Sequence, residues 1–151
     1  MKKIIICVTV VILLFTGCNS GKECSNKNAK CIEDWSNEDV KEIIVYMIDP
    51  KGNKGTTAVV QDRKKIDFIL NTMQTAEPMP GDLKVIPPDY EAEIVLKDKN
   101  ITPSSIQLWL PSESEGMIVF SDSSSQGYKV TKEQNKGIKE IIESVRIYPA
   151  K

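Results

Sequence analysis

The sequence predicts an α+β fold, in which a mostly antiparallel sheet of about five or six strands carries two amphipathic helices packed on one face. Several short segments alternate apolar and polar residues, which is typical of half-buried strands, while two longer segments repeat apolar residues at helical spacing. Each element has only one apolar face, and the simplest way to bury all of these faces is to place both helices on the same side of one sheet. The other side of the sheet is then expected to be partly solvated.

The first predicted unit is a hairpin followed by a helix. Residues 41–49 (KEIIVYMID) are rich in branched side chains, residues 50–55 (PKGNKG) have turn composition, and residues 56–62 (TTAVVQD) return as a second strand. Asp62 is placed to cap a helix over the next twelve residues, whose apolar side chains share one stripe. That stripe consists of Ile66, Ile69, Leu70 and Met73.

A long connection follows at residues 76–89 (AEPMPGDLKVIPPD), which contains four prolines. Long segments without secondary structure are uncommon in small domains and are often functional. Its apolar residues and a tryptophan on a later strand are the candidate partner surface, which comprises Met79, Leu83, Val85, Ile86 and Trp109. The alternative is a crossover that packs these apolar groups over the edge of the core.

The second half of the chain is a predicted meander. Residues 90–98 (YEAEIVLKD) and 105–111 (SIQLWLP) alternate cleanly, and residues 116–122 and 127–131 continue the pattern. Trp109 is out of phase with its apolar neighbours, so we expect it on the solvated side of the sheet, where an aromatic side chain suits binding. The alternative is that a helix end or the N-terminal segment covers it.

A second helix is expected to close the domain. Thr131 and Gln134 have the spacing of a capping box, which marks a helix start. The following apolar residues again form one stripe, made by Ile138, Ile141, Ile142 and Val145.

The front of the chain has the composition of an export signal. Lys2 and Lys3 precede an apolar run over residues 4–15, which is shorter than the roughly 20 residues that a membrane-crossing helix needs. Residues 18–34 are polar and read as a flexible tether. We therefore expect a signal peptide at 1–17, a tether at 18–34 and one α+β domain at 35–151.

The end of the apolar run, LLFTGC, resembles the lipobox of bacterial lipoproteins, although Phe15 departs from the usual leucine. The resemblance implies that the signal is cut between Gly17 and Cys18 and that the Cys18 sulfur carries a diacylglyceryl group. Two acyl chains give stable anchoring without a spanning helix. The expected location is the extracytoplasmic face of the cell membrane, and the lysine- and isoleucine-rich composition with few arginines is typical of a low-GC Gram-positive bacterium.

Composition excludes several classes of function. Without Lys2 and Lys3 the mature part has 18 basic against 21 acidic residues, a formal charge of −3, which gives neither a nucleic-acid footprint nor a polybasic run for anionic lipid. The chain has no histidine, so it lacks the usual general base near neutral pH and most zinc chemistry. We expect no cofactor and no metal. Cys24 and Cys31 either close a small disulfide loop or remain two free thiols.

The folded part also resembles a known group. PPDYEAEIVL (87–96), IQLWLP (106–111) and GYKVT (127–131) before a final helix resemble the YhfM-like small lipoproteins of Bacillus-type bacteria, and the resemblance spans roughly residues 40–147. It implies no enzymatic activity.

Two functions from different classes follow. The first is a membrane-anchored, non-catalytic binding or accessory module whose partner is an envelope protein; a module that masks such a protein differs from it only in consequence. The alternative is a small envelope hydrolase that uses Glu91 and Glu93, which lie on one strand face about 6–7 Å apart.

Overall fold

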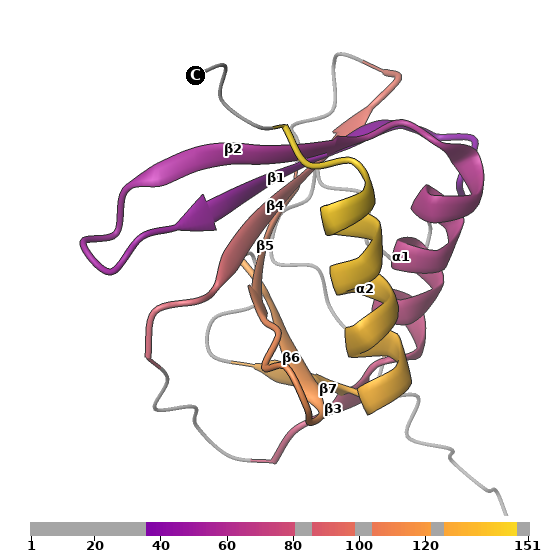
Figure 1. Cartoon of the computed structure of the whole chain (residues 1–151). Helices are drawn as coiled ribbons and strands as arrows, with labels where there is room; N and C mark the ends of the chain where they lie inside the picture. Colours follow the sequence, from indigo (N-terminus) through magenta and orange to yellow (C-terminus); the bar gives the residue numbers. More distant parts are fainter. Residues whose placement is uncertain (1–35, 81–85, 99–103, 122–125, 148–151) are drawn as a thin grey trace, which may run out of the picture.

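The computed structural model describes residues 36–80, 86–98, 104–121 and 126–147 (Figure 1). These residues form one seven-stranded sheet, and every neighbouring pair of strands in it is antiparallel. The strand order is β2-β1-β4-β5-β6-β7-β3. The strands are β1 (Val40–Ile48), β2 (Lys54–Val60), β3 (Glu77–Pro78), β4 (Tyr90–Leu96), β5 (Ser104–Trp109), β6 (Gly116–Phe120) and β7 (Gly127–Val130).

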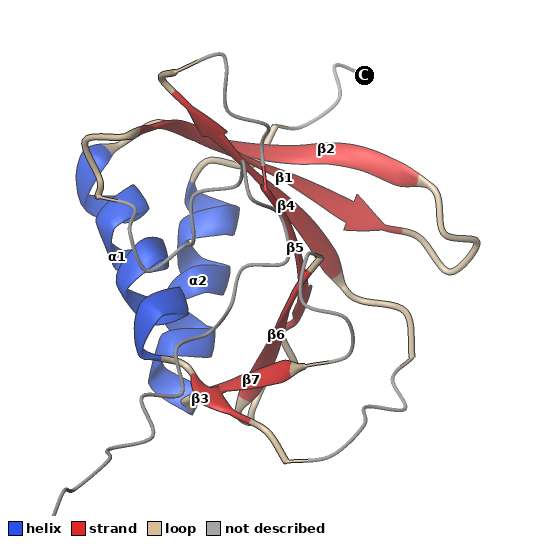
Figure 2. Cartoon of the chain, turned by 180° about the vertical axis from the view of Figure 1, so that it is seen from behind, coloured by secondary structure: helices blue, strands red, loops and turns tan. Residues whose placement is uncertain are grey.

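Two helices complete the α+β fold, α1 (Arg63–Thr75) and α2 (Lys132–Ser144). Figures 1 and 2 show them side by side within the curve of the sheet. Each begins at a residue whose side chain accepts a backbone N–H, Asp62 for α1 and Thr131 for α2, and Thr131 forms the expected capping box with Gln134. Local sequence therefore fixes where both helices start.

The core lies between the helices and the sheet. In β4, Ala92, Ile94 and Leu96 are buried, and Tyr90, which shares their phase along the strand, is only partly buried. The stripe residues of α1 are all buried. The largest fully buried side chains are Ile43, Ile66, Met73, Ile94, Ile106, Leu108, Ile118, Ile138 and Ile142. Residues on the opposite face of β4, Glu91, Glu93 and Val95, are partly exposed.

The strand count differs from the prediction of five or six because of β3. This two-residue strand lies within the predicted long connection and pairs with β7, Glu77 opposite Lys129 and Pro78 opposite Tyr128. The Met79 N–H continues the pairing by donating to the Gly127 carbonyl. Glutamate and proline are both uncommon in strands, so β3 forms because the fold places it beside β7 and not because of its local sequence.

Candidate functional site

A groove lies at the end of the sheet where β1 ends, β4 begins and β5 ends. It is lined by residues 47–50, 86–90 and 109–112 together with Lys139 of α2, and its volume is about 770 Å³. We call it the Tyr90 groove. Its size falls in the range of ligand-binding clefts, and its lining is mainly apolar side chains and prolines.

Asp89 joins the strand ends that border the Tyr90 groove. Its carbonyl accepts the Ile48 N–H at 3.1 Å and its own N–H donates to the Leu108 carbonyl at 3.0 Å. Its side-chain Oδ2 accepts the N–H of Leu110, which is 2 % exposed, at 2.8 Å. One residue therefore ties the end of β1 to the end of β5 just before β4 begins.

Trp109 is hydrogen-bonded to the segment that precedes Asp89. Its Nε1–H donates to the Ile86 carbonyl at 2.8 Å, and its side chain is only 8 % exposed. Trp109 is therefore buried and not exposed, and the group that accepts its indole N–H belongs to Ile86, not to a helix end or the N-terminal segment. Its role in a partner surface stays a prediction. The Trp109 side chain still lines the Tyr90 groove, where it forms part of the wall.

The β1–β2 turn forms a second wall. Asp49 Oδ1 accepts the backbone N–H groups of Lys51 and Asn53, and Oδ2 accepts the Asn53 amide. These bonds, with the Asn53 side chain the largest cause, lower the pKa of Asp49 below its ordinary value. Gly52 has φ +82°, a backbone conformation that favours glycine, so the sequence itself favours this turn.

The α2 side of the Tyr90 groove is held by two side chains. Buried Asn135 donates its amide to the carbonyls of Pro111 and Ser114, each at 2.7 Å, and so fixes the β5–β6 loop against the helix. One turn further along α2, Lys139 Nζ donates to the Ser112 hydroxyl at 3.2 Å.

Two exposed apolar side chains and one half-buried tyrosine line the groove. Met47 is 44 % exposed and Ile86 is 76 % exposed, which is unusual for such large apolar side chains at one place. Tyr90 packs partly against the core, and burial, before any nearby charge, raises the pKa of its hydroxyl. At neutral pH the Tyr90 hydroxyl is therefore a neutral donor and acceptor. This combination suits binding of an apolar or peptide group more than bond cleavage.

The paired carboxylates lie elsewhere, on the helix-free face of β4. Glu91 accepts hydrogen bonds from Lys54 and Ser105, and Glu93 accepts one from the Tyr46 hydroxyl at 3.0 Å. Burial alone would raise the pKa of Glu91, but the bonds from Lys54 and Ser105 outweigh it and the pKa is lowered. A general acid needs a raised pKa. The hydrolase interpretation stays a prediction, and the Tyr90 groove does not include either carboxylate.

The predicted partner surface is brought together only in part. Ile86 and Trp109 meet at the Tyr90 groove, whereas Met79 lies beside β7, where its carbonyl accepts the Gln126 amide. Leu83 and Val85 lie outside the described residues, as do Gly17, Cys18, Cys24 and Cys31. Sequence reasoning missed Met47, Asp89, Tyr90 and Lys139 as groove residues. The pair of prolines before Asp89 was the available signal, since prolines hold that segment extended.

Within the described ranges, no group of three or more cysteine, aspartate or glutamate residues is placed to hold a metal ion. Across the same ranges, neither α1 nor α2 has the length and apolar character that a bilayer crossing requires.

Fold and groove together define a small α+β domain with a mainly apolar groove at the end of an antiparallel sheet. A sequence model described as YhfM protein matches residues 39–148. Because this match covers most of the chain, the chain belongs to the YhfM protein family. Searches of curated proteins and of solved structures gave no match.

Proposed function

We propose that the protein is a membrane-anchored extracytoplasmic lipoprotein whose domain acts as a non-catalytic binding or accessory module at the cell surface. The anchor in this proposal is a diacylglyceryl group on Cys18, and the partner is an envelope protein that inserts an apolar segment into the Tyr90 groove. The observation that carries the binding role is the exposure of Met47 and Ile86 in the lining of the groove that also contains half-buried Tyr90.

The physical reason is the cost of leaving such groups in water. Single exposed apolar residues are ordinary on a protein surface. When a partner covers two large ones in the same groove, the buried apolar area stabilises the complex by about 25 cal/mol for each Å². Asp89 and Asn135 hold the walls in place beforehand, which limits the entropy lost on binding.

The anchor is tested by metabolic labelling with a fatty acid. Wild-type protein should incorporate the label and stay with the membrane fraction, and Cys18→Ala should lose both. Cys24→Ala is the matched control, since it removes a nearby cysteine of the predicted tether and should change neither. Labelled Cys18→Ala protein would contradict the assignment.

The groove is tested by affinity capture of envelope proteins on the full-length chain. Met47→Asp with Ile86→Asp places charge on two exposed positions and should leave the fold intact while abolishing capture. Ile147→Asp is the matched control, because Ile147 is 50 % exposed and lies outside the Tyr90 groove. Equal capture by wild type and the double variant would rule out the groove as the binding site.

A further inference from the structure

The methionines of the described residues differ sharply in exposure. Met73 lies in the core at 0 % exposed, and Met79 and Met117 are partly buried. Met47 is 44 % exposed and lines the Tyr90 groove. Its thioether is a flexible apolar group that oxidation converts to a polar sulfoxide. Among the described methionines, Met47 is therefore the one that a dissolved oxidant reaches most easily.

The register of the sheet explains why Met47 is open. It lies opposite Gly55 of β2 on one side and opposite Tyr90 of β4 on the other. Directly opposite residues of antiparallel strands present their side chains on the same face, so Tyr90 flanks Met47 whereas the glycine has no side chain to cover it. A Cβ at Gly55 would meet no heavy atom within 4 Å. Because β2 is the last strand at this end of the strand order, Met47 is accessible from the sheet edge.

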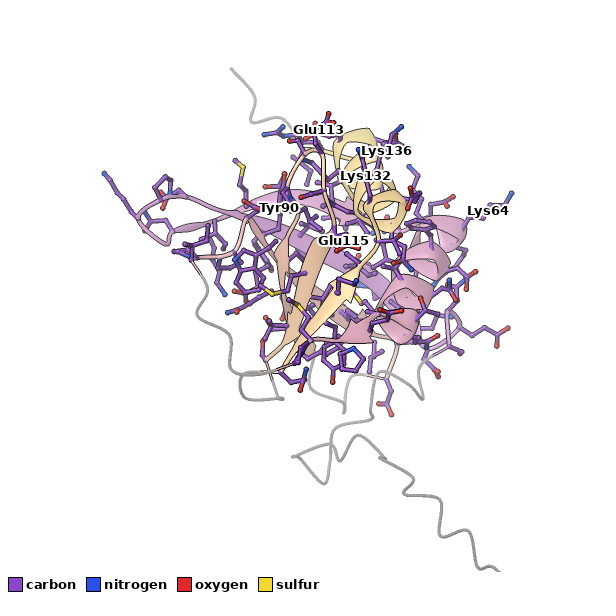
Figure 3. All side chains as sticks on the ribbon, turned by 90° about the horizontal axis from the view of Figure 1, so that it is seen from below. Lys64, Tyr90, Glu113, Glu115, Lys132 and Lys136 are labelled. Atoms are coloured by element: carbon purple, nitrogen blue, oxygen red, sulfur yellow. The ribbon has the colours of Figure 1, made fainter. Side chains whose placement is uncertain are left out.

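The backbone holds Met47 at the Tyr90 groove. Its N–H donates to the hydroxyl of Thr57, a buried residue of β2, at 3.1 Å. Figure 3 shows Tyr90 beside the β1–β2 hairpin, on the opposite side of the view from Lys64 of α1. A change in polarity at Met47 therefore takes place next to the half-buried tyrosine that lines the same groove.

We propose that Met47 is a site of reversible oxidation, and that its sulfoxide makes the Tyr90 groove polar and weakens the binding of apolar groups. This inference rests on the proposed binding role of the groove. The oxidant is a peroxide: an S–O bond forms at Met47 Sδ, the O–O bond breaks, sulfur loses two electrons, and the other oxygen leaves as water with the proton of the transferred hydroxyl. A methionine sulfoxide reductase reverses the step, because two thiols become a disulfide and the sulfoxide oxygen leaves as water.

The lining of the groove explains why the sulfoxide weakens apolar binding. Its oxygen binds water while the groove is open, and an apolar group that covers it removes that water. The backbone N–H groups of Ile48, Asp49 and Leu110 already donate within the domain, and the prolines of the lining have none to offer. The backbone therefore does not replace the lost water. Burying a polar group without full compensation weakens binding by about tenfold.

Peptide mapping tests the modification site. The mature chain, residues 18–151, carries Cys18→Ala so that neither lipid nor detergent is needed, and it is treated with hydrogen peroxide. Mass spectrometry then reads the sulfoxide at each methionine against time. We expect Met47 to be oxidised about tenfold faster than Met73, with Met79 and Met117 between them. Oxidation of Met47 that is no faster than that of Met117 would overturn the assignment of this site.

Binding of the neutral apolar dye Nile red tests the effect on the groove. The component that belongs to the groove is the one that Met47→Asp with Ile86→Asp removes. Peroxide should weaken this component about tenfold, and treatment with a methionine sulfoxide reductase and a dithiol should restore it. Met47→Leu has an apolar side chain without sulfur, so its dye affinity should be the same before and after peroxide. Met117→Leu is the matched control and should respond to peroxide as the wild type does.

The outcomes separate this inference from the proposed function. Groove binding of the dye that survives oxidation of Met47, or an equal loss in Met47→Leu, would overturn the switch and leave the groove as an apolar binding site. Dye binding that the reductase does not restore would overturn the reversibility. Absence of a groove component in untreated wild-type protein would overturn the apolar groove itself, on which the switch and the proposed function both rest.

Discussion

Asp89 gives the sharpest test of how the Tyr90 groove is built. Its carboxylate is the acceptor for the buried N–H of Leu110, and removing it in Asp89→Ala leaves that N–H without a partner in the structure. A hydrogen bond to a charged group contributes about 1.5–3 kcal/mol, and an orphaned buried donor costs a similar amount. We therefore expect Asp89→Ala to lower the free energy of unfolding by about 2 kcal/mol. Asp89→Asn keeps an oxygen acceptor and should lose about 1 kcal/mol or less.

Urea unfolding followed by far-ultraviolet circular dichroism measures this loss, with the slope against denaturant expected to stay constant. Asp67→Ala is the control, because Asp67 is an exposed aspartate on α1, and its change should stay within about 0.5 kcal/mol. An Asp89→Ala protein as stable as wild type would refute the reasoning. Equal losses in the alanine and asparagine variants would show that the acceptor oxygen is not what matters.

Three further predictions concern stability. Gly116→Ala should cost about 1–3 kcal/mol in denaturant unfolding, because its Cβ would lie 2.9 Å from Val130 Cγ2, whereas Gly55→Ala meets open space and should be near neutral; equal effects would contradict the close packing. Thr131→Ala removes the capping box of α2 and should cost about 1 kcal/mol by the same measurement, and no change would show that the cap is dispensable. Glu91 has a folded pKa below its ordinary value of 4.5, so it stabilises the fold above that pH and the contribution is lost as the pH falls towards the folded pKa. The stability difference between wild type and Glu91→Gln should therefore shrink in acid, and a constant difference would be inconsistent with the lowered pKa.

Much of the fold could be predicted because the spacing of apolar residues along the chain indicates which side chains are buried. In β4 the alternation of Ala92, Ile94 and Leu96 with partly exposed neighbours specifies both the strand and its inner face. The capping box at Thr131 specifies the start of α2 in the same local way. β3 could not be predicted, because Glu77 and Pro78 form a strand only where β7 presents a free edge.

The candidate site was harder to predict because it is assembled from separate segments. Trp109 has the phase of an outward-facing residue, and only the fold shows that Ile86 reaches back to accept its indole N–H. Met47, Tyr90 and Lys139 converge from β1, β4 and α2, and no spacing along the chain brings them together. The loop residues predicted as a partner surface therefore include Ile86, an exposed residue of the groove, but not the groove residues from β1, β4 and α2.

The central claim is that the anchored domain binds an envelope partner through the Tyr90 groove. The most direct measurement is photo-crosslinking in intact cells from a reactive side chain placed at position 86, with position 147 as the control. Our account predicts a discrete crosslinked protein from position 86 that is absent from position 147 and disappears when Met47→Asp is added. Crosslinks that are the same from both positions, or none from position 86 in protein held at the membrane, would contradict it.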